Sequence, residues 1–221
     1  MTPDPISKIE MTPDPNHRLA VLISGRGTNL QSLIDATRDT RLDATIAVVI
    51  SNRADAGGLE RASRAGIETL VLDHRGWPSR EDYDRAIVRE LQARDVRLIC
   101  LAGFMRRFSD VMLEAFPNAI LNIHPSLLPA FPGLHPHQQA LEHGVKVSGV
   151  TVHLVTSDLD AGPIIVQRSV PVHADDTPDT LAARILVEEH KAYPEAVSIV
   201  LAGGWRVDGR RFVRSTTDAG V

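Results

Sequence analysis

The chain has 221 residues, a formal net charge of -4 at neutral pH, and apolar residues at 43% of its positions. This length can bury a substantial core, and the acidic balance argues against a nucleic-acid-binding surface or a basic membrane anchor. No apolar run approaches the roughly 20 residues of a membrane span, and no hydrophobic signal core is present. The single cysteine, Cys100, lies in an apolar run and is expected to be a buried, inert thiol. The composition predicts a cytoplasmic protein without a nucleic-acid or membrane partner.

The ends of the chain differ in character from its centre. The pentapeptide Met-Thr-Pro-Asp-Pro occurs at positions 1–5 and again at 11–15. So short and polar a repeat contributes little to a core, so residues 1–18 are expected to form a disordered tail. Residues 19–214 are expected to form a single domain, followed by a second tail at 215–221.

The first predicted strand, at 19–24, leads into a glycine turn, Gly25–Asn29, and then into an amphipathic helix. Gly25 and Gly27 let the backbone approach a ligand closely, and the start of the helix directs free N–H groups at an anion. Thr28 and Asn29 add side-chain donors. The third glycine of a dinucleotide fingerprint is missing. The pattern fits either a phosphate site or a tight turn with an N-cap.

The next elements alternate between strands and helices. Strands are predicted at 44–51, 67–72 and 97–103, and helices at 56–65, from 80 after the N-cap Ser79, and from 110 until Pro117. Such alternation predicts an α/β protein with a doubly wound, mostly parallel sheet, whose ligands bind at the carboxyl ends of the strands. Arg80 could be a solvated charge or face a ligand. The loop Met105–Phe108 could line a pocket or cover the core.

The segment after the apolar run 119–123 contains several prolines and a glycine, which exclude both helix and regular strand. A rigid loop carrying Asn122, His124 and His135 is therefore expected to leave the sheet. Asparagine can donate a hydrogen bond to a developing oxyanion, and histidine can hold or release a proton near neutral pH. This segment is the best candidate for the chemistry of the protein.

The C-terminal part lacks alternating helices at first. Strands predicted at 147–155 and 164–172, joined by an acidic turn, indicate an antiparallel extension of the sheet. A helix is expected from Thr177–Pro178 to about Tyr193, with a kink at Pro194. A last hairpin is expected at 205–212.

Five of the nine histidines lie between positions 124 and 153. One interpretation is a metal site made from His124, His135, His137, His153 or Asp160, although the spacing matches no zinc motif. The other is acid–base catalysis, in which Asp160 stabilises a histidine imidazolium beside the amide of Asn122. The combination with Asn122 favours catalysis without a metal.

Four segments, in order along the chain, resemble the phosphoribosylglycinamide formyltransferase family of the formyltransferase superfamily. They are Ser24-Gly-Arg-Gly-Thr-Asn29, Leu101-Ala-Gly-Phe-Met-Arg106, Leu121-Asn-Ile-His-Pro-Ser-Leu-Leu-Pro129 and Leu159-Asp-Ala-Gly-Pro163. The resemblance covers about residues 19–205. It implies the formyltransferase fold, with a phosphate-binding half at 19–118 and a folate and catalytic half at 119–214.

The resemblance also implies a reaction and its residues. The co-substrate would be 10-formyltetrahydrofolate, the acceptor glycinamide ribonucleotide, and the protein a monomer or homodimer. Asn122, His124 and Asp160 match the catalytic positions. Ribonucleotide-binding positions are matched by Gly27, Thr28, Asn29 and Glu189, and folate-binding positions by Arg80, Met105, Arg106, Arg107, Phe108 and Asn122. Arg107 and Phe108 stand where the family more often has smaller aliphatic residues.

Three alternative functions share parts of this pattern. A 10-formyltetrahydrofolate hydrolase uses the same trio but has an N-terminal regulatory domain, which residues 1–18 cannot form. A methionyl-tRNA formyltransferase is expected to have a further C-terminal domain and a basic surface. A non-enzymatic module that binds a phosphate ligand would not need Asn122, His124 and Asp160.

Overall fold

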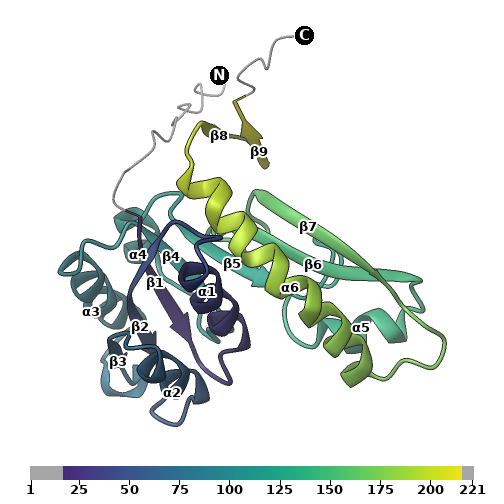
Figure 1. Cartoon of the computed structure of the whole chain (residues 1–221), viewed down its shortest axis with the longest axis horizontal. Coiled ribbons are helices and arrows are strands. Elements are labelled where there is room, and N and C mark those ends of the chain that lie inside the picture. The colour runs from purple at the N-terminus through teal and green to yellow at the C-terminus, as the bar shows by residue number, and fades with distance from the viewer. Residues whose placement is uncertain (1–16, 216–221) are drawn as a thin grey trace.

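The computed structural model describes residues 17–215, so the repeated pentapeptide and nearly all of the two predicted tails lie outside the described residues (Figure 1). One boundary of the prediction was wrong: Arg18, expected in the N-terminal tail, is the first residue of strand β1. Its backbone pairs with Thr45 in the neighbouring strand, and its carbonyl accepts a hydrogen bond from the amide of Arg97. These backbone bonds start the sheet one residue earlier than the apolar run indicated.

The first half alternates strands and helices as predicted. Its elements are β1 (Arg18–Ile23), α1 (Thr28–Arg38), β2 (Thr45–Ser51), α2 (Gly57–Arg64), β3 (Thr69–Val71), the 3-10 turn η1 (His74–Gly76), α3 (Arg80–Gln92), β4 (Leu98–Leu101), α4 (Asp110–Ala115) and β5 (Ile120–His124). The side chain of Ser79 caps α3 by accepting a hydrogen bond from the amide of Asp82. The carboxylate of Asp82 in turn accepts a hydrogen bond from the Ser79 hydroxyl rather than from the Ser79 backbone, a variant of the capping box.

The second half contains α5 (Pro136–Glu142), β6 (Val147–Leu154), β7 (Ile164–Pro171), α6 (Pro178–Leu201), β8 (Trp205–Asp208) and β9 (Arg211–Arg214). The described strands form one sheet with the order β3-β2-β1-β4-β5-β6-β7-β9-β8. The neighbouring strands β3, β2, β1, β4 and β5 are parallel to one another, whereas β6 runs antiparallel to both β5 and β7. The predicted α/β fold, with a mostly parallel sheet and an antiparallel extension, is confirmed.

Helices cover both faces of the sheet. Helix α1 packs against α2 and α6, and α3 packs against α4, the division that right-handed crossovers on this strand order require. In Figure 1 the long helix α6 crosses the sheet beside α1. Strand β1 lies at the centre of the parallel strands β3-β2-β1-β4-β5, and its residues 19–23 are fully buried. Cys100 is also fully buried, and burial raises the pKa of its thiol to about 12, which fits the expected inert role.

Helix α6 does not stop near Tyr193 but continues past Pro194 to Leu201. Proline lacks the N–H that would bond to the carbonyl four residues earlier. The helix nevertheless persists because residues on both sides of the proline are buried: Tyr193, Ala196, Val197 and Val200. This apolar packing offsets one lost hydrogen bond. Although α6 is long, no helix of the described residues is both long and apolar enough to cross a membrane.

Asn122 and His124 lie within strand β5 rather than on the irregular loop that follows it. The strand extends to His124 because β6 pairs along it, with Asn122 opposite His153 and His124 opposite Thr151. Their side chains are thus fixed by a paired strand in the middle of the sheet. The expected irregular loop begins only at Pro125.

Candidate active site

A cavity of about 440 Å³ lies beside β5 and β6. Its walls come from four parts of the chain: residues 103–108 after β4, residues 122–125 at the end of β5, residues 133–136 before α5, and residues 153–160 in and after β6. Most of these segments follow the carboxyl end of a strand, where an α/β sheet places its ligands. The cavity is therefore the site at which the expected chemistry can be examined.

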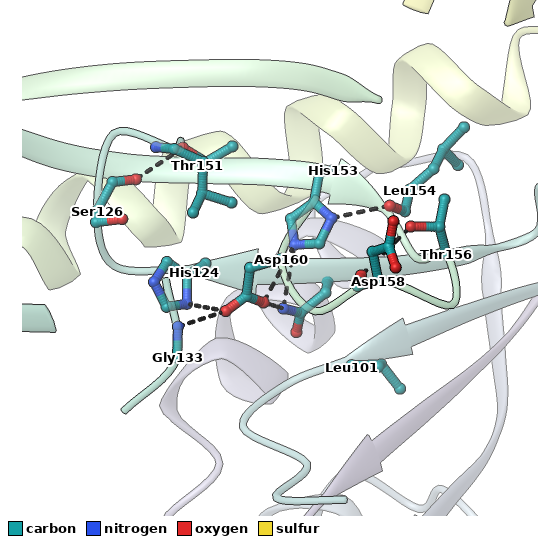
Figure 2. Close-up of polar contacts among 12 residues, drawn as sticks. Leu101, His124, Ser126, Gly133, Thr151, His153, Leu154, Thr156, Asp158 and Asp160 are labelled. Atoms are coloured by element: carbon teal, nitrogen blue, oxygen red, sulfur yellow. Dashed lines mark hydrogen bonds and ion pairs between the residues drawn. The ribbon is translucent and has the colours of Figure 1, made fainter. Parts of the chain in front are cut away.

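Asn122, His124 and Asp160 meet at this cavity, as the sequence predicted. Nδ1 of His124 lies 3.5 Å from Oδ2 of Asp160, and the two side chains are only 7% and 8% exposed. Nδ2 of Asn122 donates to Oδ1 of the same carboxylate, also at 3.5 Å. In Figure 2 the Asp160 carboxylate points toward both His124 and His153. One buried carboxylate thus contacts both other members of the predicted trio.

The backbone around Asp160 holds this carboxylate in place. Asp160 adopts a left-handed conformation with φ of +50°, which is uncommon for a residue with a side chain. The amide of Gly133 donates to its Oδ2 at 2.8 Å, and this bond is drawn in Figure 2. Strained backbone of this kind is often found at functional sites. Here it turns the side chain back toward β5.

Both ring nitrogens of His124 face acceptors. Nε2 lies 2.9 Å from the carbonyl oxygen of Phe131, and Nδ1 faces the Asp160 carboxylate. A neutral imidazole carries only one N–H, so only the doubly protonated ring can donate in both directions. The ring of His124 is thus held between the carbonyl of Phe131 and the carboxylate of Asp160.

His153 is a cavity residue that the predicted catalytic set did not include. Its Nδ1 lies 2.8 Å from the carbonyl of Leu154, and its Nε2 lies 3.3 Å from Nδ2 of Asn122. Burial lowers the pKa of His153, so the ring is neutral, with Nδ1–H donating to the carbonyl and Nε2 accepting from Asn122. The signal for this contact was the hairpin register, which pairs Asn122 with His153.

The remaining histidines give no support to a metal site. Among residues 17–215, no group of three histidine, cysteine, aspartate or glutamate side chains is arranged to hold an ion. His135 is exposed and precedes α5 with φ of +57°, and burial lowers the pKa of His137, which leaves it neutral at pH 7.

The glycine loop forms a second candidate site. Gly27 has φ of +71° and packs so closely on α2 that an added Cβ would lie 2.6 Å from the Cα of Gly58. Two carbonyls of the loop are turned toward α2, where Gly58 N bonds to Gly25 O and Arg61 Nε bonds to Arg26 O. No side chain caps the start of α1. The first N–H groups of α1 are consequently available to an anion.

Asn29 and Glu189, 160 positions apart in the chain, meet beside this loop. Nδ2 of Asn29 donates to Oε2 of Glu189 at 2.6 Å. Burial raises the pKa of the Glu189 carboxyl, while the bond from Asn29 opposes that shift. Oδ1 of Asn29 is buried without a hydrogen-bond partner among the described residues. Two of the predicted ribonucleotide-binding residues are therefore in direct contact.

The predicted folate-binding residues are only partly brought together. Met105, Arg106, Arg107, Phe108 and Asn122 all line the cavity. Phe108 stacks on Phe104 with ring centroids 5.6 Å apart, and Arg107 Nη2 donates to the carbonyl of Ser157 on the opposite wall. Arg80, by contrast, does not line the cavity: it opens α3, with its guanidinium 3.7 Å from Glu81.

The sequence matches the formyl transferase family over residues 17–197. The chain therefore belongs to the formyl transferase family. Phosphoribosylglycinamide formyltransferase of Escherichia coli is 47% identical over 192 residues, which cover 87% of this chain and 88% of that enzyme. The crystal structure of glycinamide ribonucleotide transformylase 1 from Symbiobacterium toebii has a TM-score of 0.88 at 56% identity, covering 89% of this chain and 93% of that one. Within the family, the chain falls among the phosphoribosylglycinamide formyltransferases.

Similarity also extends to larger proteins. The human trifunctional purine biosynthetic protein adenosine-3 is 50% identical over 186 residues, which make up 84% of this chain but only 18% of that protein. The chain thus spans less than a fifth of the length of this relative, and the similarity concerns one part of it.

Proposed function

We propose that this chain transfers the formyl group of 10-formyltetrahydrofolate to the amine of glycinamide ribonucleotide, giving formylglycinamide ribonucleotide and tetrahydrofolate in purine biosynthesis. Membership of the family makes the chain a formyl-transferring enzyme with a folate co-substrate. The observation that carries the proposal is the contact of His124 and Asn122 with one buried carboxylate, that of Asp160, at the wall of a cavity.

In this proposal the glycine loop binds the phosphate of the ribonucleotide. Gly27, Thr28 and Asn29 would present backbone N–H groups and side-chain donors, and the dipole of α1 favours negative charge there. Glu189 would accept a hydrogen bond from the same substrate. The pairing of Glu189 with Asn29 at 2.6 Å supports a shared role.

The folate would occupy the cavity beside residues 103–108. Met105 and Phe108 provide apolar walls for the pterin ring, and the buried Nε of Arg106 has no partner among the described residues. A buried donor without a partner carries a cost that a ligand acceptor would remove. Arg80 opens α3 with its side chain about half exposed, and we assign it to the carboxylates of the folate tail.

The proposed reaction is direct transfer through a tetrahedral intermediate. The ribonucleotide amine forms a bond to the formyl carbon, the carbonyl oxygen becomes an oxyanion, and the bond from carbon to the folate N10 then breaks. Asn122 Nδ2 and the His124 imidazolium stabilise the oxyanion, with His124 Nε2 exchanging its bond to Phe131 for one to that oxygen. Asp160 keeps His124 charged and, through water, moves the proton lost by the amine to N10. These steps are complete without a metal ion.

An absorbance assay of formyl transfer from 10-formyltetrahydrofolate, with and without glycinamide ribonucleotide, tests the proposal. Tetrahydrofolate formed only when the ribonucleotide is present would support it. Formation without an acceptor would instead identify a hydrolase. Ribonucleotide binding without turnover would identify a binding module, and transfer to methionyl-tRNA in place of the ribonucleotide would identify a different branch of the family.

A further inference from the structure

A row of buried and partly buried hydrogen bonds connects the ends of four parallel strands. Oγ of Ser24, directly after β1, donates to Oδ1 of Asn52 at 2.6 Å. Asn52 directly follows β2, and its Nδ2 lies 3.4 Å from Nδ1 of His74, after β3. On the other side, the amide of Met105, after β4, donates to the same Ser24 Oγ at 2.9 Å. The order of the bonds is the order of the strands, β3-β2-β1-β4.

Ser24 is the centre of this row. Besides the two bonds of its hydroxyl, its amide donates to the carbonyl of Gly103 at 3.1 Å. Ser24 and Asn52 are only 7% and 5% exposed, so water cannot easily replace these bonds, and the loss of one partner would leave the other unsatisfied. The hydroxyl accepts from Met105 and donates to Asn52, and neither contact can be supplied by alanine.

Because of its position in the chain, Ser24 links the two proposed substrate loops. The residue immediately precedes the glycine loop, Gly25–Asn29, while Gly103 and Met105 belong to the wall of the cavity. Two hydrogen bonds, from the Ser24 amide to Gly103 and from the Met105 amide to the Ser24 hydroxyl, therefore tie the residue just before the proposed phosphate loop to the proposed folate loop. The side chain of Met105 is 67% exposed, so its backbone is anchored while its side chain faces the opening of the cavity.

We propose that Ser24, supported by Asn52, is a positioning residue shared by both substrate sites, so that the binding of one substrate favours the binding of the other. The inference rests on the proposed function of the two loops. Because two hydrogen bonds join Ser24 to the neighbouring loop, a substrate that orders one loop would partly order the other. The second substrate then binds at a smaller entropic cost, which is a coupling free energy between two sites.

Ser24→Ala tests this proposal, with Ser148→Ala as the matched control. Ser148 is also a buried serine, but its hydroxyl has no hydrogen-bond partner among the described residues. Binding of glycinamide ribonucleotide and of tetrahydrofolate, which has no formyl group to transfer, would be measured by calorimetry, each alone and in the presence of the other. For wild type we expect each ligand to strengthen the other by about fivefold or more. Ser24→Ala should lower this factor to nearly one.

Steady-state kinetics supplies the second readout. Ser24→Ala should raise the KM for both substrates, each by about tenfold, the effect of one buried hydrogen bond, with a smaller change in kcat. Ser148→Ala should leave both KM values unchanged, and Ser24→Thr, which keeps the hydroxyl, should recover most of the coupling. If Ser24→Ala does not fold, Asn52→Ala provides the second variant. It removes the acceptor of the Ser24 hydroxyl and should lower the coupling factor.

A coupling factor near one in active wild type, or an unchanged factor in folded Ser24→Ala, would overturn the proposal. A rise in only one KM would also overturn it, because the effect would then be local to one loop. Wild type without ribonucleotide-dependent transfer would instead overturn the proposed function, and the two failures are thereby distinguished.

Discussion

The glycine loop takes its groups from five consecutive residues, 25–29, whereas Asn122 and Asp160, which meet in the cavity, are 38 positions apart in the chain. The loop offers mainly backbone N–H groups in a conformation that glycine makes possible. The cavity offers side chains that are held in place by contacts with one another. Such sites should fail in different ways: changes in the loop should weaken binding and raise KM, and changes in the cavity should slow the chemical step and lower kcat.

The largest effect is expected in the cavity. Asp160→Asn and His124→Ala should each lower kcat by at least ~10²-fold. His124→Ala removes the charged donor to the oxyanion, and Asp160→Asn removes the carboxylate that keeps His124 charged. Ribonucleotide binding, measured by calorimetry, should change much less. Asp158→Asn is the control, since it makes the same chemical change on the same loop and Asp158 lines the cavity without contacting His124. If either variant kept a kcat near that of wild type, the catalytic roles assigned to His124 and Asp160 would be wrong.

A second test compares two glycines with nearly the same backbone conformation. Gly27 and Gly66 have φ of +71° and +73°, but a Cβ at Gly27 would meet Gly58 at 2.6 Å, whereas one at Gly66 would meet nothing within 4 Å. Both alanine variants carry the strain of a left-handed residue, about 1–2 kcal/mol. Only Gly27→Ala must also displace the loop, so its KM for the ribonucleotide should rise by about tenfold or more, with kcat changed less.

Stability measurements complete that comparison. Gly66→Ala should lose stability in thermal unfolding while keeping wild-type KM values. Equal KM values for the two variants would show that loop geometry does not determine phosphate binding, and the contrast between loop and cavity would then rest on the cavity alone.

A smaller effect is expected at His153, which orients Asn122 without itself belonging to the proposed catalytic trio. His153→Phe keeps a ring of similar size but offers Asn122 no acceptor, so kcat should fall by about tenfold, the equivalent of one hydrogen bond. His153→Gln retains an acceptor and should be slowed less. The pH dependence of kcat should be the same in both variants as in wild type, because burial keeps His153 neutral in wild type. Equal kcat values for the two variants would show that the acceptor is not what matters.

The sequence predicted the loop better than the cavity, and the reason is physical. A strand, a glycine turn and a helix start are local, so residues 25–29 could be recognised as a candidate anion site from spacing alone. Asn122 and His124 were recognisable as chemistry-bearing residues, but their contact with Asp160 depends on how β5 and β6 pair. Asp160 was therefore named from its residue type and from the family resemblance, whereas the contact between Asn122 and His153 became visible only with the strand register.

Other features depended on the global packing of the molecule. The row of bonds through Ser24 and Asn52 requires the strand order β3-β2-β1-β4, which places residues that are distant in sequence side by side. Helix α6 was expected to reach only to about Tyr193 because local propensity disfavours proline in a helix, but it continues through Pro194 to Leu201, where its buried residues pack on the sheet. Sequence patterns thus located most of the individual groups, while their partners followed from tertiary structure.

Glu189 connects the two halves of the chain, because it comes from the C-terminal half but its carboxylate contacts Asn29 in the glycine loop. Its pKa is raised by burial, so the folded protein binds its proton more tightly than the unfolded chain does. Stability should therefore decline as the pH rises from about 4.5, the unperturbed value, toward the raised pKa. Glu189→Gln should abolish this decline and be more stable than wild type by about 1 kcal/mol at neutral pH, while its amide keeps the bond to Asn29.

Glu188→Gln is the control for that experiment, and its sign is opposite. Hydrogen bonds from Lys191, with help from Arg168, lower the pKa of Glu188, so its contribution is present at neutral pH and is lost as the pH falls below about 4.5. Glu188→Gln should thus lose up to about 1 kcal/mol at neutral pH with an unchanged KM. Glu189→Gln should gain stability yet show a several-fold higher KM for the ribonucleotide, because a carboxylate accepts a hydrogen bond more strongly than an amide does. Unfolding curves from pH 4 to 8, together with KM values, would test both, and a Glu189→Gln variant with unchanged KM would place Glu189 outside the ribonucleotide site.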